Sequence, residues 1–393
     1  MPQNKKCRIC KSPRTTSLQN YIKLKTPYLA YEFIKPYPLD ELKEVLICKN
    51  CQFIYNFSNS NEADYMKYYR EYNKHQVRKG KLEDIDRSYF NKLILWSKKS
   101  GLKFYNKKIL DFGSGGKLLK KVFKKYEINS VSNYDINNCN IKNKKFDIII
   151  ATHVLEHIFD FNKLFIKFDK YLNSSGYLIV ATPNLNDYKK YYYGAYNCYD
   201  LEHINHFTFN TLSNLLKLNN YKILTKRIGY RLVSESLKYS EIAIIAKKNT
   251  LKEKENEKKI ITINKKYLVQ KLRLYFIKSN KEFKQCLNFY SKMLLHNEIL
   301  TIYGISSCAS RFISHIGGGL KKISFLGDTD SRLDGKKIKK IKILEFKKFS
   351  KMIDYYNNKN IVVRIIIKAV RYNNILRFLK NKLSGKKIRF SVI

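Results

Sequence analysis

Eight cysteines occur in the 393-residue chain, and four of them form two close pairs. Each pair has the spacing Cys-x-x-Cys, and 37 residues separate the two pairs. A tight turn of this length directs both thiolates to one centre, so two such turns supply four ligands and leave no position for water. The pattern predicts a structural zinc site; four unrelated thiols or a redox pair are the alternatives. The predicted ligands are Cys7, Cys10, Cys48 and Cys51.

A glycine-rich loop follows an apolar run in Ile109-Leu110-Asp111-Phe112-Gly113-Ser114-Gly115-Gly116. Glycines permit a turn that side chains would block, and the N–H groups at the start of the next helix can then face a ligand. Asp135 lies 20 residues beyond Gly115, at the end of the next predicted strand. A carboxylate there can accept hydrogen bonds from two ribose hydroxyls. The segment predicts a nucleotide-type site; two ordinary turns of an α/β sheet are the alternative.

Groups able to move protons crowd the segment 199–207, Tyr-Asp-Leu-Glu-His-Ile-Asn-His-Phe. A histidine is suited to removing a proton near neutral pH, and Glu202 directly precedes His203. This arrangement favours His203 as a general base that Glu202 orients or polarises. The alternative is that His203 and His206 hydrogen-bond within the loop and stabilise it.

Alternating strands and helices from residue 107 onward predict an α/β domain with a largely parallel sheet. Strands are expected at 108–111, up to 135, at 146–152 and at 177–182, with a turn at 174–176 before the last of these. Helices are expected at 118–125, 161–172 and 211–218, and a closing antiparallel pair at 221–227 and 241–247. The predicted domain covers residues 107–249.

The flanking segments predict further units. Residues 1–62 hold the cysteine pairs, and 63–106 form a helical connector that begins with a tyrosine stripe at helical spacing. Residues 250–262 are a charged linker, and 263–393 begin with a long helix at 267–295. Strands at 300–304, 323–326, 361–367 and 388–393, with a helix at 306–315, predict a second α/β domain.

The charge balance, 78 Lys and Arg against 32 Asp and Glu, gives a net charge of +46. Such an excess attracts anionic substrates and is also found in RNA-binding proteins, although lysine spread evenly beside abundant Asn, Ile and Tyr is typical of AT-rich coding. No apolar run reaches the length of a membrane span, and no apolar stretch follows the first six residues as a signal peptide requires. We therefore expect a cytoplasmic protein.

The central motifs resemble class I S-adenosylmethionine (SAM)-dependent methyltransferases. The motifs are Asp111-x-Gly113-x-Gly115, the acidic Asp135, and His153-Val154-Leu155-Glu156-His157 after the strand that begins with Phe146-Asp147. This resemblance implies a Rossmann-like fold over about 107–247. It also implies a SAM site that includes Asp111, Gly113, Gly115, Asp135 and His153, with His153 and His157 shaping its wall or packing.

Both flanks extend the resemblance to three-part sugar C-methyltransferases. The cysteine pairs with Tyr68-Tyr69 resemble the N-terminal zinc-binding module of that family. Tyr303-Gly304-Ile305-Ser306-Ser307, with Asp328 and Gly335, resembles its C-terminal second Rossmann-like domain. In that family a Glu-His pair lies near the substrate, which matches Glu202 and His203, and Tyr199 stands one residue further from the pair than the family's tyrosine.

Two departures from the family pattern affect the cofactor site. Lys117 stands where the family has its third loop glycine, and only ten residues separate Asp135 from Phe146. That length is too short for the usual second helix and third strand, so we expect either a rebuilt adenine pocket or weakened SAM binding.

These observations together predict an enzyme that transfers a methyl group from SAM to carbon of a nucleotide-linked keto-sugar. The alternatives are O- or N-methylation of another small acceptor, and a zinc-bearing RNA-binding protein with a degenerate, non-catalytic methyltransferase core.

Overall fold

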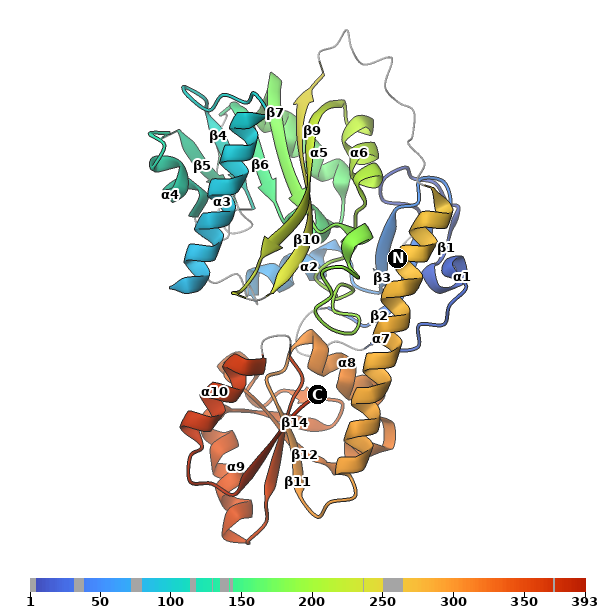
Figure 1. Cartoon of the computed structure of the whole chain (residues 1–393), viewed down its shortest axis with the longest axis vertical. Helices are drawn as coiled ribbons and strands as arrows, with labels where there is room; N and C mark the ends of the chain where they lie inside the picture. The colour runs from blue at the N-terminus through green and yellow to red at the C-terminus, as the bar shows by residue number, and fades with distance from the viewer. Residues whose placement is uncertain are drawn as a thin grey trace.

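The computed structural model describes residues 5–31, 39–71, 80–113, 118–128, 130–134, 141, 144–235, 237–249, 264–369 and 372–393. The described residues form three sheets, two of six strands and one of four. Figure 1 shows the central sheet above the C-terminal sheet, with the N-terminal strands at one side. Helix α7 (Lys265–Met293) runs from the N-terminal strands down to the C-terminal sheet. The predicted linker 250–262 lies outside the described residues.

The N-terminal sheet is antiparallel and contains one strand from the middle of the chain. Its order is β1-β2-β3-β8, and in its last pair Ile54 lies opposite His206 and Tyr55 opposite Asn205. The N-terminal sheet is therefore completed by residues that directly follow the Glu202-His203 pair. Its strands are β1 (Thr15–Ser17), β2 (Leu42–Cys48), β3 (Ile54–Ser58) and β8 (Asn205–His206), and helix α1 (Leu18–Ile22) follows β1.

The central sheet has the order β5-β4-β6-β7-β10-β9. Its first four strands are parallel, and β10 runs antiparallel to both of its neighbours, β7 and β9. Within the described part of the chain β5 is an outermost strand of this sheet. The predicted strands are confirmed, but the expected turn at 174–176 is wrong because β7 already begins at Leu172. The strands are β4 (Ile109–Phe112), β5 (Val131–Tyr134), β6 (Phe146–Thr152), β7 (Leu172–Thr182), β9 (Tyr221–Leu232) and β10 (Lys238–Lys248).

Alternate strand residues face helices on opposite sides of this sheet, as period-2 side-chain direction requires. Ile148 and Ile150 of β6 pack with α3 and α4, whereas Ile149 and Ala151 pack with α5 and α6. Helix α3, predicted as part of a connector, therefore covers the central sheet. The helices of this region are α2 (Glu62–Glu71), α3 (Lys81–Lys99), α4 (Leu118–Lys124), α5 (Phe161–Tyr171) and α6 (Phe209–Leu218).

The C-terminal sheet has the order β13-β14-β12-β11-β15-β16, parallel except for β13. The predicted strands and the helix at 306–315 are confirmed, while β13, β14, α9 and α10 were not predicted. The strands are β11 (Ile299–Tyr303), β12 (Ile323–Asp328), β13 (Lys337–Ile338), β14 (Ile341–Glu345), β15 (Val363–Ile367) and β16 (Ile388–Val392). The helices are α8 (Ser307–His315), α9 (Phe346–Asn358) and α10 (Tyr372–Lys382).

A shared core joins the three regions. Tyr199 and Leu201, from the loop before β8, pack in one cluster with Ile22 of α1, Tyr275 of α7 and Phe312 of α8. The guanidinium of Arg273 also donates to the carbonyl oxygens of Ile22 and Lys23, both at 2.8 Å. The described helices include none with the length and apolar character needed to cross a membrane.

Candidate active site and metal centre

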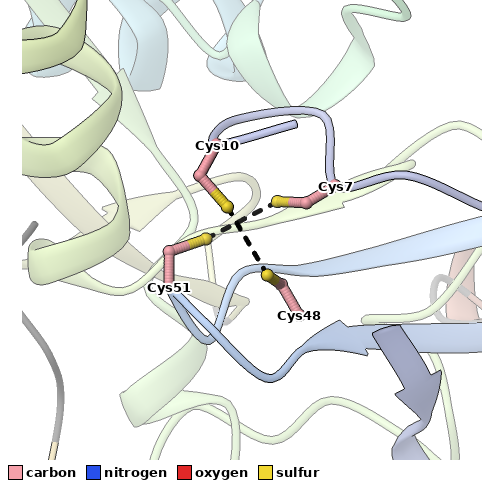
Figure 2. A group of neighbouring side chains, drawn as sticks. All are labelled: Cys7, Cys10, Cys48 and Cys51. Atoms are coloured by element: carbon pink, nitrogen blue, oxygen red, sulfur yellow. Dashed lines mark hydrogen bonds between the residues drawn. The ribbon is translucent and has the colours of Figure 1, made fainter. Parts of the chain in front are cut away.

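Four cysteine side chains converge on one point in the N-terminal region, as Figure 2 shows. The Sγ atoms of Cys7 and Cys51 lie 3.5 Å apart, those of Cys10 and Cys48 lie 3.6 Å apart, and all four lie within 4.8 Å of one another. With metal–sulfur bonds of ~2.3 Å, a tetrahedral shell places its sulfurs ~3.8 Å apart. The cluster is therefore compatible with zinc in both ligand chemistry and spacing.

Local backbone geometry explains why the two pairs close in the same way. In each case the residue after the second cysteine of the pair has a left-handed conformation, with φ of 58° at Lys11 and 61° at Gln52. The backbone N–H of Lys11 donates to the Cys7 carbonyl, and that of Gln52 donates to the Cys48 carbonyl. Two matching turns thus present four thiolates to one centre.

The Glu202-His203 pair lies in a turn held by neighbouring polar groups. Asp200 Oδ1 accepts the backbone N–H groups of Glu202 (3.0 Å) and His203 (2.7 Å). Burial raises the pKa of Asp200, although the nearby His203 acts in the opposite direction. The imidazole of His203 packs edge-on against His157, with ring centroids 4.9 Å apart, and makes no hydrogen bond to the described residues. It is thus a half-buried ring whose nitrogens can serve a ligand.

Two tyrosines of α2 contact the same turn. The Tyr68 hydroxyl donates to the Glu202 carboxylate, and the Tyr69 hydroxyl lies 3.0 Å from His157 Nδ1. Nδ1 also lies 2.8 Å from the Glu202 carbonyl oxygen, which can only accept, so Nδ1 carries the proton of the neutral ring. Burial, and then the Glu202 charge, raise the pKa of Tyr69 well above its ordinary value. Tyr69 therefore remains a hydrogen-bond donor at neutral pH.

A buried network of charged side chains lies next to this site. His153 bridges two carboxylates, with Nδ1 3.1 Å from Glu156 and Nε2 3.1 Å from Glu241. Burial and Arg231 oppose protonation, but hydrogen bonds to both carboxylates raise the pKa of His153. Burial likewise opposes ionisation of the carboxylates, yet hydrogen bonds from His153 lower the pKa of Glu156 and of Glu241 to about 2. The network thus holds an imidazolium between two carboxylates.

Glu156 connects this network to the two other histidines. Its carboxylate and the ring nitrogens of His157 and His203 lie within 4.8 Å of one another. Its second oxygen accepts the Thr182 hydroxyl at 3.1 Å. After the hydrogen bond from His153, the nearby His157 and His203 also help to lower the pKa of Glu156.

His206 and Tyr199 occupy the core instead. His206 is fully buried, bonded to the Tyr188 hydroxyl (3.1 Å) and Asn56 Oδ1 (3.0 Å), and burial lowers its pKa well below the ordinary value. It is a neutral structural histidine. Tyr199 is also fully buried, its ring 4.3 Å from that of His206, and its hydroxyl has no hydrogen-bond partner among the described residues. This placement favours packing over a chemical role for Tyr199.

The glycine loop begins at the carboxyl end of β4 and approaches the residues that follow β6. Gly113 has φ of +83°, and a Cβ there would lie 2.4 Å from a methyl group of Val154. Only glycine fits beside Val154 with this backbone conformation, and the turn lies at the carboxyl edge of the sheet, where ligands of parallel sheets bind. Asp111 is buried and accepts a hydrogen bond from the Asn133 amide at 3.2 Å. Gly115 and Asp135 lie outside the described residues.

Residues 82–226 match the family model described as a methyltransferase domain. This segment is a SAM-dependent methyltransferase domain. The match begins within α3 and ends within β9, so it contains β4 to β8 and the Glu202-His203 turn. The enzyme class predicted from the glycine loop is therefore confirmed, whereas no comparison tests the substrate or the individual site residues.

Solved structures with the same kind of domain are similar at low identity. A SAM-dependent methyltransferase from Methanosarcina mazei is 18% identical, with 38% of this chain and 95% of that chain covered and a TM-score of 0.28. One from Archaeoglobus fulgidus is also 18% identical, with 42% and 94% covered and a TM-score of 0.31. A putative methyltransferase from Bacillus halodurans is 14% identical, with 42% and 100% covered and a TM-score of 0.31. No curated protein matches the sequence.

The structure also brings polar residues to the methyltransferase domain that the sequence did not single out. Arg8 and Asn56 bond the backbone around His203, Asn205 bonds the backbone on either side of His157, and Glu241 bonds His153. Each acts across a long sequence separation, so no local pattern marks it. Two of them carried a clue, because Arg8 lies inside the first cysteine pair and Asn205 lies within the polar segment 199–207.

Proposed function

We propose that this enzyme methylates carbon of a nucleotide-linked keto-sugar in sugar or surface-glycan biosynthesis in the cytoplasm. The observation that carries the proposal is the His203 imidazole beside Glu156, His157 and Glu202, at the end of the methyltransferase sheet. C-methylation requires removal of a proton from carbon next to a ketone, and a positioned histidine supplies such a base. The high positive charge favours a diphosphate-bearing substrate.

In this proposal His203 accepts the proton and becomes an imidazolium. The Glu156 carboxylate, within 4.8 Å, compensates that charge, as does the neighbouring Glu202. The oxygen of the substrate's enolate needs a hydrogen-bond donor, and the Tyr69 hydroxyl is proposed for this role because it lies beside His157 and the Glu202 backbone. Tyr199 is assigned no chemical step because its hydroxyl lies in the core.

The SAM site is proposed at the loop after β4. The matched motif supplies Asp111, Gly113, Gly115 and Asp135, and Gly113 makes the left-handed turn at the carboxyl end of β4. His153 is proposed to shape the wall of this site, since both of its ring nitrogens are bonded to carboxylates. When bound, SAM supplies a methyl group on a positively charged sulfur, the electrophile that an enolate carbon requires.

Zinc bound by Cys7, Cys10, Cys48 and Cys51 is the second part of the proposal. The four thiolates leave no open coordination position, so the metal has a structural role.

The test is incubation of the purified enzyme with SAM and a panel of nucleotide-linked 4-keto and 3-keto sugars, followed by mass spectrometry and NMR. We expect a product heavier by one methyl group, with the new methyl bonded to carbon. A product with the new methyl group on oxygen or nitrogen would contradict C-methylation and support O- or N-methylation instead. Absence of SAM binding at millimolar concentration in calorimetry would contradict catalysis as a whole.

A further inference from the structure

Arg8 lies between two of the predicted metal ligands, Cys7 and Cys10, and its side chain points away from them toward the active-site turn. One guanidinium nitrogen donates to the carbonyl oxygen of Ile204 (3.2 Å) and to Asn205 Oδ1 (3.0 Å). The other donates to the Asn56 carbonyl oxygen at 3.1 Å. Three acceptors at fixed positions match the planar fork of arginine, which a lysine ammonium cannot reproduce.

Aromatic rings hold the guanidinium in this orientation. Its central carbon lies 5.2 Å from the ring centroid of Tyr55 and 5.1 Å from that of Phe159. Arginine stacks on aromatic faces because the ring quadrupole attracts the cation. The side chain is thus fixed at both ends, by the backbone of the cysteine turn and by this contact.

Two buried asparagines extend the contacts of Arg8 to both active-site histidines. Asn56 donates through Nδ2 to the carbonyl oxygens of Asp200 (2.6 Å) and His203 (3.1 Å). Asn205 donates through Nδ2 to the carbonyl oxygens of Leu155 (3.0 Å) and Ile158 (2.7 Å), on either side of His157. Both amides are almost completely buried, so any displacement leaves polar atoms without partners.

We propose that Arg8 is a positioning residue that couples the four-cysteine cluster to the catalytic geometry of His203 and His157. Metal binding fixes the Cys7–Cys10 turn, the turn fixes Arg8, and Arg8 with Asn56 and Asn205 fixes the backbone that carries both rings. The inference rests on the proposed function in that His203 is the base. The further point is that the metal affects turnover through the Arg8 side chain, in addition to its effect on stability.

The first experiment compares Arg8→Met with Arg14→Met in the full-length enzyme. Methionine keeps an apolar stem for Tyr55 and Phe159 but removes all donors, and Arg14 is an exposed arginine of the same region. We expect Arg8→Met to keep its metal content and SAM affinity but to lower kcat by about 10- to 100-fold, the order that a small misplacement costs. Arg14→Met should match wild type. Arg8→Lys, which keeps a single donor nitrogen, should have a kcat between those of wild type and Arg8→Met. It takes the place of Arg8→Met if that variant does not fold.

The second experiment needs no substrate. Hydrogen exchange of the peptides covering 200–206 and 155–158 is measured before and after metal removal by a chelator. In wild type we expect faster exchange after chelation; in Arg8→Met exchange is already fast and changes little on chelation. Wild-type exchange in Arg8→Met overturns the coupling, whatever the activity. If the coupling appears but His203→Ala keeps full turnover, the assignment of His203 as base fails while the coupling stands.

Discussion

At the scale of single residues, the hydrogen-bond partners of the histidines give these side chains different charge states. His153 donates to two carboxylates and is held charged, whereas His206 bonds a hydroxyl and an amide oxygen in the core and is held neutral. His203 bonds none of the described side chains through its ring and faces His157. Among these three histidines, His203 is the one that is half-buried with a ring free of hydrogen bonds to the described residues, so it is the candidate for the base.

Replacing His203 by alanine should lower turnover of the keto-sugar by about 10²–10⁴-fold, the contribution of a positioned base. SAM affinity in calorimetry should stay close to wild type because Gly113 and its loop are untouched. In deuterated water the wild type should exchange the proton next to the ketone, and the variant should not. His296→Ala, which alters an exposed histidine, is the control. Full exchange and turnover by His203→Ala would make it a structural residue.

His206 requires a different prediction from the one its sequence suggests. Loop position alone implies a mild effect of His206→Ala, but the structure places this ring between Tyr188 and Asn56 in the core. Its loss would therefore destabilise the protein, so this variant is not a useful catalytic control.

The buried ion network should give the protein a characteristic stability profile with pH. The folded pKa of Glu156 and of Glu241 is about 2 against 4.5, so their contribution is present above pH 4.5 and is lost as pH falls toward 2. The raised pKa of His153 gives a contribution present below pH 6.5 that is lost as pH rises through the folded value. The network should therefore stabilise most between about pH 4.5 and 6.5.

Chemical denaturation across this pH range tests the profile. Glu241→Gln should lower the free energy of unfolding by about 3 kcal/mol near pH 5.5, because it leaves His153 and Arg227 short of a partner. Glu235→Gln, which removes an exposed ion pair with Lys81, should cost less than about 1 kcal/mol. Equal losses for the two variants, or no pH dependence of the difference, would contradict the assigned role.

At the scale of secondary-structure elements, function depends on where parallel strands end. β4 ends at Phe112, directly before Gly113, and β6 leads into His153 and His157, so the glycine loop and the histidines share one edge of the sheet. Parallel strands place their carboxyl ends together, and ligands of such sheets bind there. The close approach of Gly113 to Val154 joins the two strand ends.

Gly113→Ala should therefore impair both SAM binding and stability. The added Cβ meets Val154 at 2.4 Å, and the left-handed backbone is strained for alanine. We expect SAM affinity in calorimetry to fall by at least about tenfold, or ~1.4 kcal/mol. Gly101→Ala is a matched control, with φ of +85° and no atom within 4 Å of its Cβ position. It should lose about 1 kcal/mol of stability through strain and retain SAM affinity; similar SAM affinities for both variants would exclude a cofactor role for the loop.

At the scale of the whole molecule, the cysteine cluster and the active site share one sheet. β2 ends at Cys48, β3 follows the second cysteine pair, and β8 adds the residues after His203. The N-terminal region therefore cannot be exchanged without altering the strand that directly follows the Glu202-His203 turn of the methyltransferase domain.

Cys48→Ser should reduce zinc, measured by elemental analysis, to well below the one ion per chain that we expect in wild type. Metal binding and folding are coupled in small thiolate sites, so the N-terminal strands should lose their structure. Because β8 pairs with β3, protease sensitivity should also extend to residues 200–206. Cys308→Ser keeps a hydroxyl for Asn197 and should leave the metal content unchanged. Less than a tenth of an ion in wild type would contradict the zinc proposal.

The sequence by itself determined the features that short segments encode. The Cys-x-x-Cys spacing located the cluster, glycine and strand patterns located the loop after β4, and residue periodicity located most strands of both six-stranded sheets. These features depend on neighbours within a few residues, where turn geometry and side-chain alternation act directly.

Only the tertiary structure decided which groups act on one another. The Tyr68 hydroxyl reaches Glu202, Arg8 reaches Asn205, and Glu241 reaches His153, each across more than 80 positions of sequence. It also placed Tyr199 and His206 in the core, although both stand beside residues that face the site. Hydrogen bonds and burial depend on where residues lie in space, and packing of the whole core determines those positions. The spacing of residues along the sequence therefore does not predict them.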